Sequence, residues 1–302
     1  MSDVSHQEFV EIADRCFVAR YAEWDVSVGV VLGSSGLAVI DTRASARQGR
    51  QLHNDVRRFA PGCPLRWVIN THEHFDHTFG NVSMTGATIY AHENVSAGLK
   101  GSADRVKRLI ETDRELDPDH PEITGQVLDD VLATGLRAPD VVFASVATID
   151  LGDRLIELMH PGRGHTDGDV VARVPDADVV FGGDLVEQSG PPSFGPDSFP
   201  LDWPTSLDLV VGLLTDGSVV VPGHGATVDR QFVQAQRADV SDVSQLIRSL
   251  YQQGVALDDA LAAGGDGWPY PAAHLATAVR RGYTHLASQH EGSRQTLPLV
   301  ER

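Results

Sequence analysis

The chain has 302 residues and a formal net charge of −18, and 41% of its residues are hydrophobic. A chain of this size and composition can bury a large core, which excludes a disordered protein and predicts one large domain or one domain with an appendage. The acidic charge argues against binding to nucleic acid or to an anionic membrane, since both select basic surfaces. Cys16 and Cys63 lie far apart, so neither a disulfide framework nor a zinc ribbon is indicated.

The first part of the chain predicts strands and one helix. Residues 9–21, 25–32 and 37–40 are rich in Val, Ile, Phe and Ala and predict three strands. Asp41 follows the last of them, where open α/β sheets tend to place polar site residues, and a helix is expected over residues 44–59. Asp41 is therefore either a residue that supports a site or only the cap of that helix. The N-terminus has no basic start and no apolar run, and no stretch of about 18 apolar residues follows, so we expect a cytoplasmic protein.

The stretch 70–80 directly follows a buried apolar run and contains three histidines and one aspartate that suit metal binding: His72, His74, Asp76 and His77. In an extended backbone, the first three of these side chains share one side and the fourth points elsewhere, which permits two neighbouring metal ions. Imidazole nitrogen and carboxylate oxygen are ligands for cations such as zinc. The alternative is a histidine-rich surface loop without catalysis.

The middle of the chain, residues 92–140, has no recognisable motif. A strand is expected over residues 87–91, then a charged helix over 94–115 and a shorter helix that ends near residue 133. These helices are either an insertion that shapes a substrate pocket or a covering on the outside of the sheet.

Three later apolar runs are each followed by a candidate ligand next to glycine: His165, Asp184 and His224. Glycine permits sharp turns and close approach of the backbone to a ligand. Each of these residues alone has a turn or capping role as its alternative. Because four apolar runs, including the one before His72, all end in such residues, we expect the strand ends to meet at one rim of a sheet.

From about residue 229 the pattern becomes helical, over residues 231–251, 257–263 and 274–287. We expect a first domain at residues 1–228 and a helical C-terminal extension at 229–302 that packs on it. The extension is either a cap over the site or a dimer surface, so a homodimer is one option.

The chain resembles the metallo-β-lactamase-fold hydrolase superfamily, on its glyoxalase II, lactonase and SoxH-like side. The motif His-x-His-x-Asp-His is present at residues 72–77. The remaining motifs occur in the superfamily's order, as Val39-Ile40-Asp41-Thr42, Gly164-His165-Thr166, Gly182-Gly183-Asp184 and Pro222-Gly223-His224-Gly225. The resemblance covers roughly residues 9–229. It implies an α/β fold of the four-layer αββα type, two central sheets flanked by helices, with the helical C-terminal extension outside it.

The resemblance also implies a dinuclear site at one sheet edge, with two divalent metal ions. Zinc is expected, and iron or manganese are alternatives. The implied ligands are His72, His74 and His165 for one ion, Asp76, His77 and His224 for the other, and Asp184 as a bridge. A bridging hydroxide would be the nucleophile. Asp76 would also be catalytic as a proton acceptor, and Asp41 would orient a ligand imidazole from behind.

The substrate is the least defined part of the prediction, because this fold serves many hydrolytic reactions. Zinc β-lactamases generally lack a bridging aspartate, so Asp184 favours the glyoxalase II and lactonase-like side. Asp169 stands where glyoxalase II usually has histidine, which argues against glutathione thioesters. The loop after Asp184 resembles SoxH-type hydrolases, and Gly190, Pro191 and Phe194 would then line a substrate pocket; a plain surface loop is the alternative.

The sequence thus predicts a metal-dependent hydrolase that cleaves an ester, lactone, thioester or amide-type bond in a small molecule. β-Lactam or phosphodiester hydrolysis remain alternatives within the superfamily. A mononuclear iron dioxygenase of the persulfide type is a third, although the complete second ligand set argues against it. Neither nucleic acid nor a membrane is an expected partner.

Overall fold

The computed structural model describes residues 8–113 and 120–294. Within them, twelve strands form one hydrogen-bonded sheet in the order β7-β6-β5-β4-β3-β12-β11-β10-β9-β8, with β2 beside β3 and β1 beside β2. The N-terminal strands are β1 (Val10–Ala13), β2 (Cys16–Tyr21), β3 (Val26–Gly33), β4 (Gly36–Ile40), β5 (Leu65–Ile69), β6 (Thr88–His92) and β7 (Val141–Phe143). The later strands are β8 (Val146–Asp150), β9 (Leu155–Met159), β10 (Val171–Val174), β11 (Val179–Glu187) and β12 (Val219–His224).

The sheet has two halves that meet where β3 and β12 touch. A single antiparallel pair, Val26 with His224, joins these two strands, whereas β11 and β12 run parallel over most of their length. The halves pack against each other, because one hydrophobic cluster contains Ile69 from one half and Phe181 from the other. The predicted α/β class with central β layers is therefore confirmed, and the two layers share one continuous hydrogen-bonding path.

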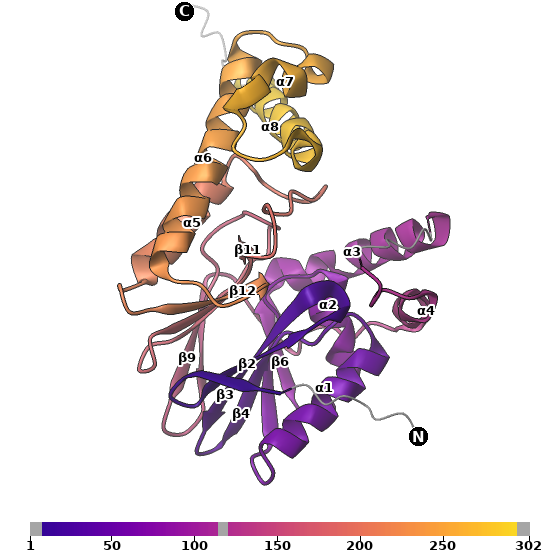
Figure 1. Ribbon diagram of the computed structural model, residues 1–302, viewed down its shortest axis with the longest axis vertical. Coiled ribbons are helices and arrows are strands. Elements are labelled where there is room, and N and C mark those ends of the chain that lie inside the picture. The colour runs from indigo at the N-terminus through magenta and orange to yellow at the C-terminus, as the bar shows by residue number, and fades with distance from the viewer. Residues whose placement is uncertain (1–7, 114–119, 295–302) are drawn as a thin grey trace, which may run out of the picture.

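Helices cover both outer faces (Figure 1). The helix α1 (Ala46–Phe59) places Leu52 and Val56 on the N-terminal half, whereas α5 (Trp203–Leu213) and α6 (Arg230–Gln252) cover the other half. The remaining helices are α2 (Phe75–Thr78), α3 (Glu93–Thr112), α4 (Gly125–Ala133), α7 (Leu257–Gly264) and α8 (Ala276–Arg294), with 3-10 turns η1 (Glu23–Asp25), η2 (Phe79–Ser83), η3 (Gly265–Gly267) and η4 (Ala272–His274). Two β layers between two helical layers produce the αββα order.

The start of α1 corrects one expectation about Asp41. The helix begins at Ala46, and its cap is Ser45, whose hydroxyl accepts a hydrogen bond from the backbone N–H of Gln48. Asp41 lies four residues earlier in a left-handed conformation with φ of 63°. Asp41 therefore does not cap the helix.

The N-terminal region also differs in detail from the prediction. The single strand expected over residues 9–21 is a hairpin of β1 and β2, because Arg15 turns the chain with φ of 54°. The helix expected over 94–115 is α3, which ends at Thr112, while residues 114 and 115 lie outside the described part. The strands β4, β5 and β6 run parallel, so their carboxyl ends reach one edge of the sheet.

The C-terminal helices α7 and α8 pack against the long helix α6 and against each other. Figure 1 shows α7 and α8 grouped at one end of the long helix α6. Ile247 of α6 and Val279 of α8 share a hydrophobic cluster with Trp203 of α5. Among the described residues, no helix is long and apolar enough to cross a membrane.

Candidate metal centre

Strand ends deliver the candidate ligands to one place. His72 and His74 lie in the loop after β5, Asp76 and His77 lie in α2, and His165 lies in the loop between β9 and β10. Asp184 and His224 belong to the neighbouring parallel strands β11 and β12. All seven residues proposed from the sequence are thus brought together, although they span more than 150 positions of the chain.

The backbone at the first motif is not extended throughout, which corrects the expected alternation. The residues from Phe75 to Thr78 form the short helix α2, and the Thr78 hydroxyl donates to the carbonyl oxygen of His74 at 2.8 Å. This turn directs Asp76 and His77 to the same place: Oδ2 of Asp76 lies 3.5 Å from Nε2 of His77. His77 therefore does not point away from the other ligands.

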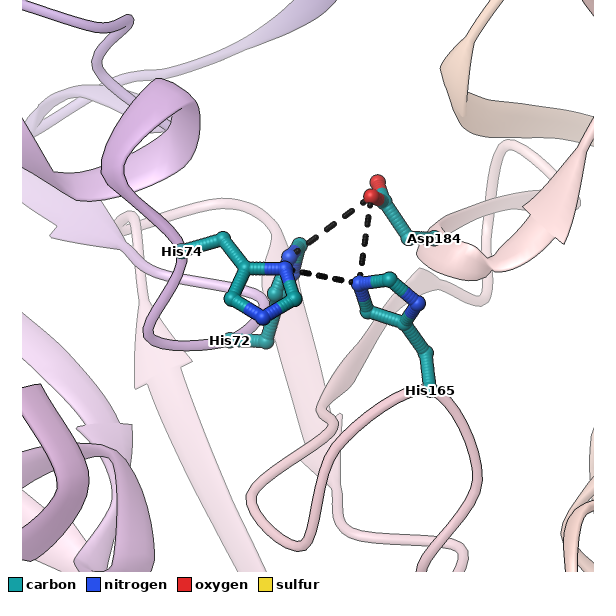
Figure 2. Close-up of side chains that lie close together, drawn as sticks. All are labelled: His72, His74, His165 and Asp184. Carbon is teal, nitrogen blue, oxygen red and sulfur yellow. Dashed lines mark hydrogen bonds and ion pairs between the residues drawn. The ribbon is translucent and has the colours of Figure 1, made fainter. Parts of the chain in front are cut away.

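The first ligand group consists of His72, His74, His165 and Asp184, whose ligand atoms lie within 4.8 Å of one another. Figure 2 shows the three imidazoles and the carboxylate directed at a common point. Oδ2 of Asp184 lies 3.6 Å from Nε2 of His72 and 3.4 Å from Nε2 of His165. Nδ1 of His74 lies 2.8 Å from Nε2 of His165.

The second group consists of Asp76, His77 and His224. The Nε2 atoms of the two histidines are 3.3 Å apart, and Oδ2 of Asp76 lies 3.5 Å from each of them. Asp184 reaches this group as well, since Oδ1 lies 3.2 Å from His77 and Oδ2 lies 3.3 Å from His224. The carboxylate of Asp184 therefore lies between the two groups.

In every histidine of the site, one ring nitrogen faces the other candidate ligands and the other points away from them. The nitrogen that points away, called the outer nitrogen below, contacts an oxygen atom. Nδ1 of His77 donates to Oδ2 of Asp41 at 2.8 Å, and Nε2 of His74 donates to Oδ2 of Asp197 at 3.1 Å. The remaining outer contacts are His72 Nδ1 to the hydroxyl of Thr71, His165 Nδ1 to the carbonyl of Ser193, and His224 Nδ1 to the carbonyl of Trp24. A neutral imidazole whose outer nitrogen donates has a lone pair on its inner nitrogen, so this orientation lets the five rings bind a cation through their inner nitrogens.

This arrangement fits a bound cation. Nδ1 of His74 and Nε2 of His165 face each other at 2.8 Å, and buried Nε2 of His72 has no hydrogen-bond partner among the described residues. Buried polar atoms without a partner are costly, and a cation placed between lone pairs removes that cost. Nitrogen and carboxylate oxygen without thiolate is a donor set that suits zinc.

The electrostatics of the two groups differ. Burial lowers the pKa of His165 to about 4, so that imidazole is neutral and able to bind metal. Burial also lowers the pKa of His224, but the charges of Asp184 and Asp76 outweigh it and raise the pKa to about 10. The carboxylates of the second group thus stabilise a positive charge at this place, which can be that of a proton or of a metal ion.

Asp41 lies directly behind the second group. It is 1% exposed and accepts hydrogen bonds from the backbone N–H and the hydroxyl of Thr71, both at 2.8 Å, in addition to His77. The carboxylate thereby fixes which nitrogen of His77 carries the proton.

Three acidic residues near the site, two of them buried and one partly buried, are absent from the sequence-based set. Asp197, in the loop before α5, contacts His74 and also forms an ion pair with Arg105 of α3. Glu187 at the end of β11 has a ligand atom within 4.8 Å of those of Asp184 and His224. Glu73 stands between His72 and His74 in the sequence. Its side chain is buried, and its Oε2 atom has no hydrogen-bond partner among the described residues.

The residues expected to line a substrate pocket occupy different environments. Gly190 is exposed and Pro191 is half-buried. Phe194 is buried, and its ring centroid lies 5.1 Å from that of Trp203, which in turn packs near His165 at 5.8 Å. Phe194 therefore supports the loop that holds a ligand, and a direct role of these three residues toward substrate stays a prediction.

Comparison with known proteins agrees with this geometry. The family model of the metallo-beta-lactamase superfamily matches residues 21–224. A metallo-beta-lactamase type 2 of Bacillus cereus is 27% identical over 208 residues, which cover 68% of this chain and 69% of that protein. The human acyl-coenzyme A thioesterase MBLAC2 is 24% identical over 222 residues, which cover 72% of this chain and 76% of that protein.

Solved structures share the fold at lower identity. The protein TMB-1 is 22% identical with a TM-score of 0.60, covering 80% of this chain and all of that one. The inverting sec-alkylsulfatase Pisa1 from Pseudomonas sp. is 16% identical with a TM-score of 0.74, covering 98% of this chain and 52% of that one. Its alignment extends over almost the whole chain, including the C-terminal helices.

Proposed function

The chain belongs to the metallo-beta-lactamase superfamily, and on that premise we propose that it is a metal-dependent hydrolase of a small molecule. The bond cleaved is an ester, lactone, thioester or amide-type bond. Two divalent ions, which we propose to be zinc, would be held by the two ligand groups, His72, His74 and His165 in one and Asp76, His77 and His224 in the other. Asp184, whose carboxylate contacts both groups, would serve both.

One observation supports this proposal above the others: five histidines direct one ring nitrogen toward the same centre while the other ring nitrogen contacts an oxygen atom. Each outer nitrogen is held by an oxygen acceptor, so the rings cannot turn their donors inward without losing a hydrogen bond. A histidine-rich surface loop has no reason to fix five tautomers in this way. A single-metal site needs only one of the two groups, so the completeness of both favours two ions.

The chemistry divides between the ions and the chain. Bound zinc polarises a carbonyl or ester oxygen and lowers the pKa of a water molecule to near 7. Asp184 and the imidazoles balance the positive charge of the ions. Asp76, whose side chain remains 12% exposed, is the carboxylate of the second group that substrate and water can reach. We assign it the role of accepting a proton from the attacking water and returning it to the leaving group.

The relatives guide the choice of substrates to test. The thioesterase MBLAC2 supports thioesters, and the similarity to the Bacillus cereus enzyme supports a β-lactam as the second candidate. Asp184 favours thioester or ester hydrolysis over β-lactam hydrolysis, because zinc β-lactamases generally lack an aspartate at this position.

The test combines metal analysis with a substrate panel. The purified protein should contain about two zinc ions per chain by inductively coupled plasma mass spectrometry, and a His72→Ala and His224→Ala double variant should lose them. The panel holds an acyl-coenzyme A, an aryl ester, a lactone, a phosphodiester and a penicillin. Fewer than one transition metal ion per chain, together with no turnover of any panel member, would contradict the proposal.

A further inference from the structure

A cavity of about 220 Å³ lies between the loop before α5 and the C-terminal helix α8. Three separate segments line it: the loop of His165 contributes Arg163, the loop before α5 contributes residues 198–200, and α8 contributes Arg281, Thr284, His285 and Ser288. None of the eight lining residues is acidic. In a chain with a net charge of −18, a cavity lined by two arginines and a histidine is a local exception.

The two guanidinium groups are held by the same aromatic ring. The guanidinium carbon of Arg163 lies 4.5 Å from the ring centroid of Phe199, and that of Arg281 lies 5.0 Å from it. Arg163 also pairs with Asp202 at 2.5 Å, which neutralises part of its charge. Arg281 donates through Nε to the carbonyl oxygen of Ser198 at 2.8 Å, and no carboxylate among the described residues pairs with it. Its terminal nitrogens thus remain available to an acceptor.

Ser198 takes part in this arrangement through its backbone. Its side chain is completely buried, and its carbonyl oxygen accepts from Nε of Arg281 and so fixes the direction of the guanidinium group. A bound oxyanion would accept from the terminal nitrogens of Arg281.

The cavity is connected to the metal centre through short backbone links. The N–H of Phe199 donates to the carbonyl oxygen of Gly164, the residue before the ligand His165, at 2.8 Å. Ser198 directly follows Asp197, which contacts the ligand His74. The same loop therefore has one side at the metal ligands and the other at the cavity.

We propose that this cavity binds a compact oxyanion, a carboxylate, phosphate or sulfate group, and that in catalysis this group is the anionic end of the substrate. The terminal nitrogens of Arg281 provide the main contacts, and Arg163 and His285 add to the positive potential. The substrate part of the proposal rests on the proposed hydrolase function, whereas oxyanion binding does not.

The binding experiment uses the whole protein with inorganic phosphate, sulfate or acetate as the probe, measured by isothermal titration calorimetry. Arg281→Gln should weaken binding at least 10-fold. Arg280→Gln, which removes the same charge from an exposed position of the same helix, should leave it unchanged. No binding of any probe, or equal affinity in both arginine variants, would overturn the proposal.

The kinetic experiment separates a substrate-borne oxyanion from a free one. It compares a thioester or ester that ends in a carboxylate with its methyl-capped neutral analogue. Arg281→Gln should raise KM at least 10-fold for the carboxylate substrate only, with kcat unchanged. If phosphate binds through Arg281 but both substrates respond equally, the site takes a free oxyanion and the substrate assignment is wrong. Absence of turnover would refute the hydrolase function and leave the binding result standing.

Discussion

Nε2 of His74 lies 3.1 Å from Oδ2 of Asp197, and Arg105 contacts the same carboxylate oxygen. This links a candidate metal ligand after β5 to the loop before α5 and to the helix α3. Burial raises the pKa of Asp197, but the hydrogen bond with His74 and the charge of Arg105 outweigh it and hold the pKa below its usual value. An ionised Asp197 keeps the proton on Nε2 of His74, so Nδ1 faces the other ligands.

The first prediction follows from this contact. Asp197→Ala should lower zinc affinity at the first group by roughly 10- to 100-fold, the usual cost of losing such an outer contact. Competition with a chromophoric chelator measures the affinity directly. Asp202→Asn is the control, because Asp202 lies in the same region but pairs with Arg163 and no ligand histidine. Equal zinc affinity in the two variants would mean that Asp197 does not position His74.

Asp41→Asn tests the support of the second group. Asparagine tolerates the left-handed conformation at this position, so the substitution removes the charge without adding backbone strain. Loss of the charged acceptor for Thr71 and His77 should destabilise the fold by about 1–3 kcal/mol and weaken zinc binding. Urea unfolding of the zinc-free variant isolates the first effect, and chelator competition isolates the second. An unchanged zinc affinity would show that His77 keeps its orientation without the charge.

How much of this site could be predicted depended on the kind of signal. Four of the seven candidate ligands fall within a six-residue motif and the other three follow apolar runs, so sequence order and residue type were sufficient to group them. The strand expected to end at Asp184 instead continues to Glu187. Asp197 carries no such signal, because its loop contains prolines and glycine without periodicity and its partner lies 123 positions earlier. Contacts of that kind arise only when the two halves of the sheet pack together.

The fold shows the same division. Strand positions were predictable from apolar runs, as for β4 and β5, whereas ends and turns depended on single side chains. Ser45 caps α1, whereas the carboxylate of Asp41 accepts hydrogen bonds from Thr71 and His77. The helical turn at Asp76 is closed by the backbone N–H of His77 and by the hydroxyl of Thr78, which both donate to the carbonyl oxygen of His74, and no pattern of hydrophobic residues reveals this.

Glu187 predicts a pH dependence of stability in the zinc-free protein. Burial, followed by the charge of Asp184, raises the pKa of Glu187 to about 7. The folded state then holds a proton between pH 4.5 and 7 that the unfolded state has released, so stability falls as pH rises through this window. The loss amounts to about 3 kcal/mol and is complete above pH 7. Glu187→Gln, measured by urea unfolding in EDTA, should lack this loss; parallel pH profiles of the two proteins would refute it.

Asp76→Asn tests the proton-transfer role. The amide keeps an oxygen that can approach the second group, but it cannot accept a proton. Turnover of the best panel substrate should fall by about 10²- to 10⁴-fold, the range for loss of a general base. Zinc content measured on the same sample separates lost chemistry from lost metal. A variant that retains both ions and full turnover would remove Asp76 from the catalytic step.

The last prediction concerns the backbone beneath Asp184. A methyl group at Gly223 would overlap Oδ1 of Asp184. The backbone nitrogen of Asp184 would lie only 3.0 Å from the same methyl group, so the methyl has no room to move toward that strand. Because β11 and β12 are paired here, the strain cannot be relieved by a surface movement, and the carboxylate must leave its place between the two ligand groups. Gly223→Ala should therefore fold but bind fewer than two zinc ions per chain. Gly190→Ala is the matched control, since no atom lies within 4 Å of the added methyl. Circular dichroism establishes folding and mass spectrometry counts zinc; two ions in folded Gly223→Ala would mean that Asp184 is not required between them.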